Sequence, residues 1–149
     1  GPNGDYVLVT ETGRYQVTRY WLNGPQSGTT DVFIDNLPGF PDNISYDDDG
    51  RFWLALYAPR DPALDLTLPQ PWLRKVLFRL PQWMHPEPKP YAAIVALDTE
   101  GRVVANAQAS GPDVFAPVTS VKRQGDVLFL GSLSYPGVAR LPVSAATAD

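Results

Sequence analysis

Short apolar runs separated by turn residues dominate this chain and predict β-strands. Three segments share one order, in which a turn is followed by an apolar strand, a short link and a second strand. The expected strands are 6–11 with 15–22, 52–57 with 92–97, and 127–133 with 138–143. Runs rich in Val, Leu, Phe, Tyr and Trp are typical of strands that are buried on both faces. The pattern therefore predicts an all-β fold.

A glycine turn opens each of the three segments. The turns are Asn3-Gly4, Asp49-Gly50 and Gln124-Gly125, and glycine reaches the positive φ that tight hairpins need. Gly4 and Gly50 lie 46 positions apart (50 − 4), which matches the ~40–50-residue repeat of propeller blades. Gly50 and Gly125 lie 75 positions apart (125 − 50), about 30 more than that repeat allows. The excess predicts an insertion over residues 58–90.

Apolar residues at helical spacing predict a helix inside this insertion, over residues 71–84, and thus a helical insertion around residues 66–85. The apolar stripe consists of Trp72, Leu73, Val76, Leu77 and Leu80, and Arg74, Lys75 and Arg79 lie mainly on the other side. Pro71 suits a first helical turn, whereas Pro81 would end or kink the helix. The helix could cap the sheet, contact a membrane surface through its cations, or act as a mobile lid over a substrate pocket.

Composition narrows the classes of partner. The chain has 149 residues, 44% of them hydrophobic, which is enough for one domain with a core. A net charge of −4 and a pI near 4.8 argue against a nucleic-acid partner, because the chain has no excess of positive charge to bind phosphates. The absence of cysteine excludes disulfides, thiolate metal sites and cysteine nucleophiles. We see no signal peptide and no apolar run near the ~18 residues of a membrane span, and the compartment stays open.

Asp42 and Asn43 are the first candidates for a functional site. They stand at the start of an expected strand, and a carboxylate with an amide carbonyl suits a hard cation such as Ca²⁺. Alternatively, Pro41-Asp42-Asn43 is a turn whose side chains cap the local backbone. The nearby run Asp47-Asp48-Asp49-Gly50 lacks the spaced ligands and the distal Glu of an EF-hand. We therefore expect that run to be a solvated hairpin turn.

Several short motifs spread along almost the whole chain carry a family resemblance. They are Glu11-Thr12-Gly13-Arg14-Tyr15, Arg19-Tyr20-Trp21, Asp42-Asn43, Trp72-Leu73-Arg74-Lys75, Val118-Thr119-Ser120-Val121 and Gly131-Ser132-Leu133. Their combination resembles the strictosidine synthase-like family, which includes the adipocyte plasma membrane-associated proteins. The wider superfamily contains the gluconolactonases and the paraoxonases.

The resemblance implies a fold and a partner. Family members are six-bladed β-propellers, so residues 1–149 would be the C-terminal half, about three blades, with the innermost strand of the first blade missing. A half-propeller leaves open sheet edges, which favour association. We expect closure with a second half-propeller, either in a homodimer or with an N-terminal half outside this chain.

The resemblance also implies a metal site. The residue that matches Asp42 binds the catalytic calcium or other divalent ion in paraoxonases and gluconolactonases, and in paraoxonases the residue that matches Asn43 does too. We therefore expect Ca²⁺, or another divalent cation, in the complete propeller, with further ligands from outside this chain. The expected function is metal-dependent hydrolysis of small esters or lactones. The alternative is a non-catalytic binding or scaffold propeller.

Four further residues bear on the proposed reaction. In true strictosidine synthases the position that matches Thr119 holds the glutamate that drives the condensation, and a threonine cannot act as an acid or base near neutral pH. A strictosidine synthase-type condensation enzyme is therefore a third alternative, less favoured than the hydrolase and the binding propeller. Arg14 and Tyr15 follow a strand and could bind an anionic substrate, or could serve blade packing and a surface ion pair. His85, in a proline-rich loop, is expected at the surface, so the catalytic base stays unassigned.

Overall fold

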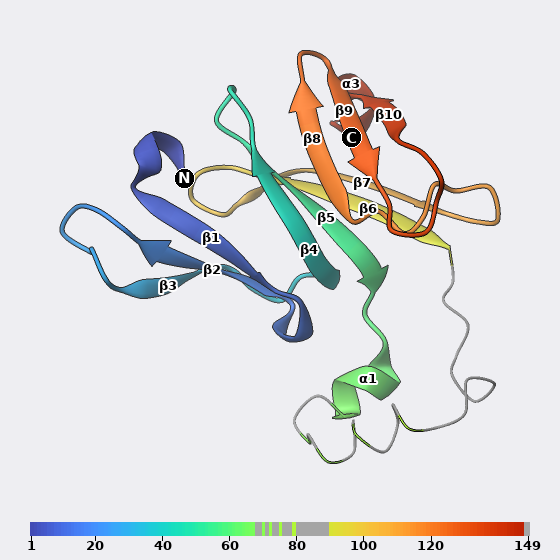
Figure 1. Cartoon of the computed structure of the whole chain (residues 1–149), viewed down its shortest axis with the longest axis horizontal. Helices are drawn as coiled ribbons and strands as arrows, with labels where there is room; N and C mark the ends of the chain where they lie inside the picture. The colour runs from blue at the N-terminus through green and yellow to red at the C-terminus, as the bar shows by residue number, and fades with distance from the viewer. Residues whose placement is uncertain (68–69, 71, 73–74, 76–78, 80–89, 148–149) are drawn as a thin grey trace.

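Three antiparallel sheets lie side by side in the computed structural model of this chain (Figure 1). The structure describes residues 1–67, 70, 72, 75, 79 and 90–147. The first sheet has the order β1-β2-β3, the second β4-β5-β6-β7, and the third β10-β9-β8. The expectation of a mostly β fold is confirmed.

The elements have the following bounds. The strands are β1 (Tyr6–Glu11), β2 (Gln16–Trp21), β3 (Thr30–Ile34), β4 (Gly39–Tyr46), β5 (Phe52–Pro59), β6 (Tyr91–Leu97), β7 (Val103–Ser110), β8 (Ser120–Gln124), β9 (Val127–Gly131) and β10 (Ala139–Pro142). The helices are α1 (Pro62–Thr67) and α3 (Val143–Ala146), and single 3₁₀ turns are η1 (Pro2–Gly4) and η2 (Thr12–Arg14).

Glycine turns join neighbouring strands where the sequence predicts them. Gly50 has φ 83° between β4 and β5, and Gly125 has φ 58° between β8 and β9. A residue with a side chain is strained at such angles, so glycine permits these tight hairpins. The hairpins make consecutive strands neighbours, which gives the second and third sheets their simple order.

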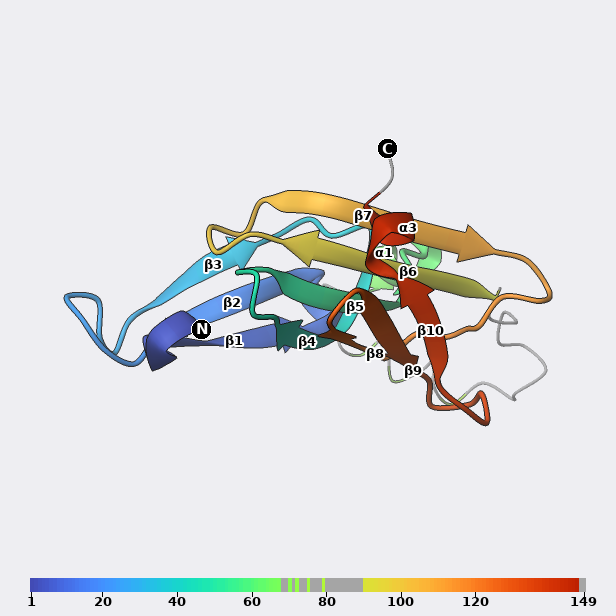
Figure 2. The same ribbon diagram turned by 90° about the horizontal axis from the view of Figure 1, so that it is seen from above.

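Two hydrophobic clusters hold the three sheets together. The second sheet lies between the other two (Figure 2), and its β5 contributes side chains to both clusters. Leu54 and Leu56 face the first sheet, whereas Trp53 and Ala55 face the third, as the alternation of a strand requires. All four side chains are fully buried. The prediction that strand 52–57 is buried on both faces is therefore confirmed for residues 52–56.

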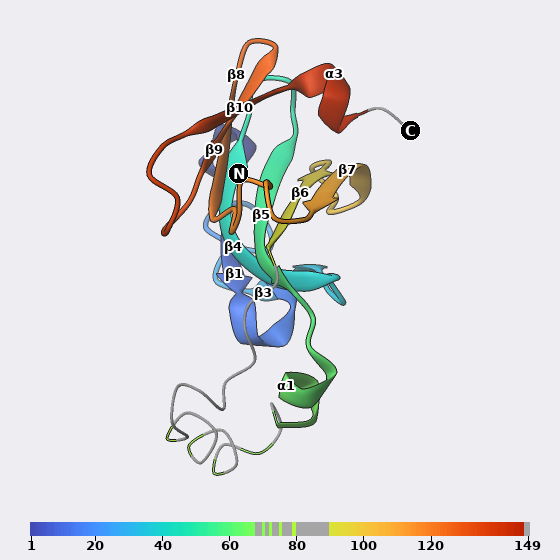
Figure 3. The ribbon, with the colours of Figure 1, turned by 90° about the vertical axis from the view of Figure 1, so that its right-hand side faces the viewer.

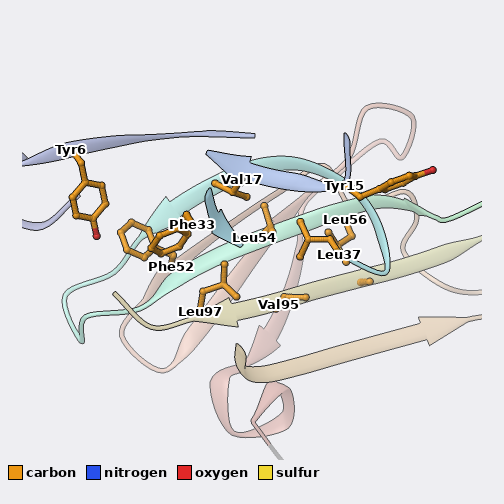
Figure 4. Close-up of a cluster of buried hydrophobic side chains, with 11 residues drawn as sticks. Tyr6, Tyr15, Val17, Phe33, Leu37, Phe52, Leu54, Leu56, Val95 and Leu97 are labelled. Carbon is orange, nitrogen blue, oxygen red and sulfur yellow. The ribbon is translucent and has the colours of Figure 1, made fainter. Parts of the chain in front are cut away.

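The first cluster fills the space between the first and second sheets (Figure 4). Phe33 and Phe52 meet edge to face with their ring centroids 5.5 Å apart, and Tyr6 packs beside both rings. Tyr15 lies at the far end of the cluster, with its hydroxyl directed away from these rings. Burial of aromatic surface at this interface removes a large apolar area from water.

Continuous burial does not extend to the outer sheets. In β1, Val7 and Val9 are exposed while Tyr6 is buried, so this strand has one open face. The expectation of burial on both faces is wrong for β1, because the described residues place no sheet against its outer face. The strands β3 and β7 are absent from the predicted set, since threonine, alanine and polar residues interrupt their apolar pattern.

The insertion begins on the side from which β4 and β8 start. The helix α1 follows β5 there, beyond the ends of the sheets (Figure 1 and Figure 3). The helix expected over residues 71–84 falls largely outside the described residues, as does His85, so its role as cap, membrane contact or lid stays a prediction. Within the described part of the chain, no helix has the length and apolarity to cross a membrane.

Candidate functional site

Asp42 and Asn43 lie at an irregularity of β4. In the pairing with β5, Pro41 is opposite Leu56 and Ile44 is opposite Leu54, so two residues of β4 face the single Ala55. An extra residue in one strand is a β-bulge, which re-aims side chains and is common beside functional sites. The sequence places these two residues at the start of a strand, whereas in the structure they lie at a bulge in the middle of β4 (Gly39–Tyr46).

Asn43 joins the second sheet to the third. Its Nδ2 donates to the backbone oxygen of Thr119 at 2.7 Å, and its backbone N–H donates to the same oxygen at 3.2 Å. The Nδ2 group also donates to Asp42 Oδ1 at 3.2 Å. Asn43 Oδ1 makes no hydrogen bond within the described residues, so it remains available as an acceptor. Asn43 therefore does more than cap its own turn.

Asp42 is a half-buried carboxylate without a cation beside it. Burial raises its pKa above the ordinary value, and no ion pair to Asp42 exists among the described residues. Its one hydrogen bond comes from Asn43. An ionised carboxylate in this position gains free energy from any cation that approaches it. Together with Asn43 Oδ1, it presents two hard oxygen donors of the kind that calcium prefers.

These two side chains supply a part of a metal site at most. No group of three or more His, Cys, Asp or Glu side chains that could hold a metal comes together in the described ranges. Calcium takes six to eight oxygens, so a complete site would need ligands from elsewhere.

Thr119 is buried, and its polar groups serve the joint between sheets. Its N–H and its hydroxyl both donate to the backbone oxygen of Gly131, at 2.9 and 3.3 Å. Its own carbonyl accepts from Asn43. The structure thus brings together two predicted positions, Asn43 and Thr119, that are 76 residues apart in the chain.

A ladder of polar side chains extends this joint along β4 and β8, which run in the same direction (Figure 1). Ser45 Oγ donates to the backbone oxygen of Val121 at 2.6 Å, and Arg123 donates to Asp47 Oδ2 at 3.1 Å. We call Asn43, Ser45, Asp47 and their partners Thr119, Val121 and Arg123 the polar ladder. These contacts recur at every second residue from 43 to 47 and from 119 to 123, because every second side chain of a strand shares one face. Thr119 and Val121 accept through their backbone oxygens, whereas Arg123 donates through its side chain.

Asp47 forms the most enclosed rung. Its carboxylate accepts from the backbone N–H groups of Asp49 and Arg51, from the Trp53 indole at 2.8 Å, and from Arg123. Burial alone would raise its pKa, but these donors hold the pKa below the ordinary value. Arg123 also pairs with Asp49. The turn 47–50 is a hairpin as predicted, but the expectation of full solvation is wrong for Asp47, which is 5% exposed.

Arg14 and Tyr15 lie apart from the polar ladder. The exposed Arg14 pairs with Glu11 at 3.2 Å. Tyr15 is buried, its ring packs against Phe40 at 4.7 Å, and the Arg60 guanidinium lies 4.2 Å from the ring centroid. Burial, with Asp65 as a further cause, raises the pKa of Tyr15. Their predicted substrate-binding role stays a prediction, and the packing and ion pair that we gave as its alternative are both present.

The sequence analysis missed Ser45 and Arg123 as parts of this site. A signal for Ser45 exists, because Asn43, Ser45 and Asp47 alternate with apolar residues next to a strand whose residues 52–56 are buried. Polar residues at every second position of a strand in the core need partners on that face. No comparable signal marks Arg123, since its partner is decided by how the sheets pack.

Comparison with known proteins identifies relatives for almost the whole chain. The chain is 34% identical to "Protein STRICTOSIDINE SYNTHASE-LIKE 13" of Arabidopsis thaliana over 95% of its own length and 35% of that protein. It is 32% identical to "Adipocyte plasma membrane-associated protein" of Bos taurus over 94% of its length and 35% of that protein. No family model matches the chain. The chain thus spans about a third of the length of the curated relatives that it matches.

Proposed function

This chain belongs to the strictosidine synthase-like family, and we propose that it is part of a divalent-metal-dependent hydrolase of small esters or lactones. The observation that carries the proposal is the pair of free oxygens at the bulge of β4. Asp42 is half-buried without a cationic partner among the described residues, and Asn43 is oriented by Thr119 so that its Oδ1 stays free.

In the proposed site, each residue has a separate task. The Asp42 carboxylate and Asn43 Oδ1 hold the cation, and the Thr119 carbonyl fixes the Asn43 amide by accepting from Nδ2. A bound calcium ion would act as a Lewis acid that polarises the carbonyl of an ester or lactone. The remaining ligands and the base would come from outside the described residues.

The proposed assembly is a propeller in which the three sheets are blades. Two facts support it. Strands that are consecutive in the chain are antiparallel neighbours within each sheet, and β4 and β8 run side by side in the same direction (Figure 1). The outer faces of the first and third sheets would then pack on a second half of the propeller. That half would come from a second copy of the chain or from another part of a longer protein.

The second candidate is a propeller that binds a ligand without turnover. This alternative requires only the two oxygen donors of Asp42 and Asn43 and no catalytic base. A strictosidine synthase-type condensation is less favoured than either, because Thr119 has no titratable group.

A calcium titration of the full chain tests the metal site. After removal of divalent ions with EDTA, we expect calcium to raise the Tm, since a ligand at 100 times its Kd stabilises the folded state by about 2.7 kcal/mol. We expect Asp42→Asn to abolish the shift, and Asp48→Asn, an exposed carboxylate in the nearby turn, to retain it. A calcium shift that survives in Asp42→Asn would contradict the assignment.

Hydrolysis of phenyl acetate and of γ-butyrolactone separates the two candidate functions. Calcium-dependent turnover that is lost in Asp42→Asn would support the hydrolase. Calcium binding through Asp42 without turnover of either class of substrate would support the binding propeller instead.

A further inference from the structure

We propose that a cavity beside the Asp42–Asn43 site binds a neutral, flat apolar ring, such as the ring of a cyclic or aromatic substrate. That this ring belongs to the substrate rests on the proposed function, whereas the binding itself does not. The cavity has a volume of about 390 Å³, which falls within the size range of small-molecule pockets.

Four separate stretches of chain form the walls of this cavity. They are Tyr57-Ala58 at the end of β5, Pro90-Tyr91 at the start of β6, Ala116-Pro117 before β8, and Ser134 after β9. The cavity therefore lies where the second and third sheets meet, on the side from which β8 starts. Residues so distant in sequence come together only through the packing of the sheets.

The lining selects an uncharged ligand. None of the described lining residues is Asp, Glu, Lys, Arg or His, so a charged group would lose water without gaining a partner. The Tyr91 hydroxyl already donates to Gln108 at 2.8 Å. The hydroxyls of Tyr57 and Ser134 make no hydrogen bond within the described part of the chain. The described lining is thus mainly apolar, and the hydroxyls of Tyr57 and Ser134 are available for a hydrogen bond to a ligand.

Tyr57 is the residue best suited to contact the ring. It follows Leu56, which is fully buried, yet 41% of its own surface is exposed. Exposure of a large aromatic side chain directly after a buried run leaves its face free for stacking. Pro117 offers a second flat apolar surface in the same cavity.

Two stretches of chain connect the lining of the cavity to the proposed metal ligands. Pro41, the neighbour of Asp42, pairs with Leu56, the neighbour of Tyr57. On the opposite wall, Pro117 precedes by two residues Thr119, whose carbonyl holds Asn43.

An aromatic contact fixes the wall that belongs to the third sheet. Phe115 and Tyr135 pack with their ring centroids 4.9 Å apart. They are the sequence neighbours of Ala116 and Ser134, so their contact ties two lining stretches together. A wall held in this way is largely formed before the ligand arrives, which lowers the cost of binding.

Titration of the metal-free full chain with benzyl alcohol tests the proposal, with binding followed by the ¹⁵N–¹H amide signals of Ala58, Tyr91 and Ala116. EDTA is present throughout, so the result does not depend on the metal. We expect saturable shifts of these signals. Benzoate should bind more weakly by at least about tenfold, because its carboxylate loses hydration where none of the described lining residues carries a charge.

Tyr57→Ala tests the contact with the ring, and Tyr20→Ala is its control. Tyr20 is 39% exposed and Tyr57 is 41% exposed, but Tyr20 lies on the first sheet, away from the cavity. Tyr57→Ala should weaken benzyl alcohol binding about fivefold through loss of the stacked ring, and Tyr20→Ala should not change it. Equal binding by Tyr57→Ala, equal binding of benzoate, or no saturable shift would each overturn the proposal. Calcium binding through Asp42 would stand in those cases, whereas loss of the calcium effect alone would overturn the proposed metal site and leave the cavity assignment.

Discussion

Asp42 and Asp47 lie five residues apart in one hairpin, yet their surroundings shift their pKa values in opposite directions. Asp42 has a raised pKa because burial disfavours its charged form, and no cation lies beside it among the described residues. The donors around Asp47 overcome the effect of burial and lower its pKa. Two aspartates of one hairpin thus have different roles. Asp42 is a candidate metal ligand, and Asp47 connects the second sheet to the third.

The raised pKa of Asp42 predicts how calcium binding depends on pH. The ionised form binds the cation, so the calcium-induced rise in Tm should fade on acidification at a pH above about 3.9, the ordinary value for Asp. In the metal-free protein, acidification has the opposite effect, and protonation of Asp42 stabilises the fold. The stability that protonated Asp42 contributes is full below the unfolded pKa and is lost as pH rises through the folded pKa. Melting curves between pH 4 and 7, with calcium or EDTA, measure both effects, and an unchanged calcium effect down to pH 4 would contradict the assignment.

The lowered pKa of Asp47 predicts a part of the acid unfolding. Its contribution to stability is present above the unfolded pKa and is lost as pH falls through the lower folded pKa. Asp47→Asn should lower the free energy of unfolding at pH 7 by about 2–4 kcal/mol, since it disrupts a buried hydrogen-bonded ion pair. The loss should shrink near pH 3. Urea unfolding at both pH values checks this, with the exposed Asp48→Asn as control. A loss of the same size at both pH values would argue against it.

At the scale of elements, the polar ladder replaces the backbone pairing that separate sheets lack. β4 and β8 belong to different sheets, and one backbone hydrogen bond, from Asn43 to Thr119, joins them in the region of the ladder. Side chains supply the other rungs, from Ser45 to Val121 and from Arg123 to Asp47. The ladder thereby fixes how β4 sits against β8, and with it the position of the Asp42–Asn43 bulge.

Arg123→Met tests the ladder. Arg123 is largely buried, and its loss leaves the Asp47 carboxylate with one donor fewer in the interior. We expect the free energy of unfolding to fall by about 2–4 kcal/mol. Arg102→Met is the matched control, because Arg102 pairs with Asp98 and Glu100 at the surface. That change should cost less than about 1 kcal/mol. Urea unfolding compares the two, and equal losses would show that the ladder rung adds nothing beyond a surface pair.

At the scale of the whole molecule, the first sheet presents an open apolar face. Val7 is opposite Tyr20, Val9 is opposite Thr18, and Thr18 is opposite Val32, so these side chains share one face. The valines and Tyr20 are exposed. A row of exposed apolar side chains on a sheet favours association with another surface.

We therefore expect the full chain to self-associate at micromolar concentration. Val9→Lys should weaken association by about tenfold or more, because a lysine buried in an apolar interface loses its hydration. Val103→Lys is the control, since Val103 is exposed to a similar degree but lies at the start of β7 in the second sheet. Sedimentation velocity over a range of concentrations measures the effect. A clean monomer at micromolar concentration would contradict this expectation.

The sequence by itself determined the strands whose signal is local. Apolar runs predict β1 and β5 well, and Gly50 and Gly125 mark the hairpins, because glycine adopts positive φ without the strain that a side chain brings. The motifs, taken together, also indicate the family that the relatives confirm. For Asp42 and Asn43, the sequence predicted a position beside a strand and the oxygen chemistry of the side chains.

The tertiary structure decided everything that depends on residues far apart in the chain. The bulge that aims Asp42, the partner of Asn43 and the burial of Asp47 all follow from how β4 packs on β5 and β8. A hydrogen bond between residues 76 positions apart leaves no trace in local periodicity. The cavity at Tyr57 has the same origin, since four stretches of chain meet to form it. Local propensity selects the strands, whereas the packing of sheets selects the neighbours of each side chain and therefore its chemistry.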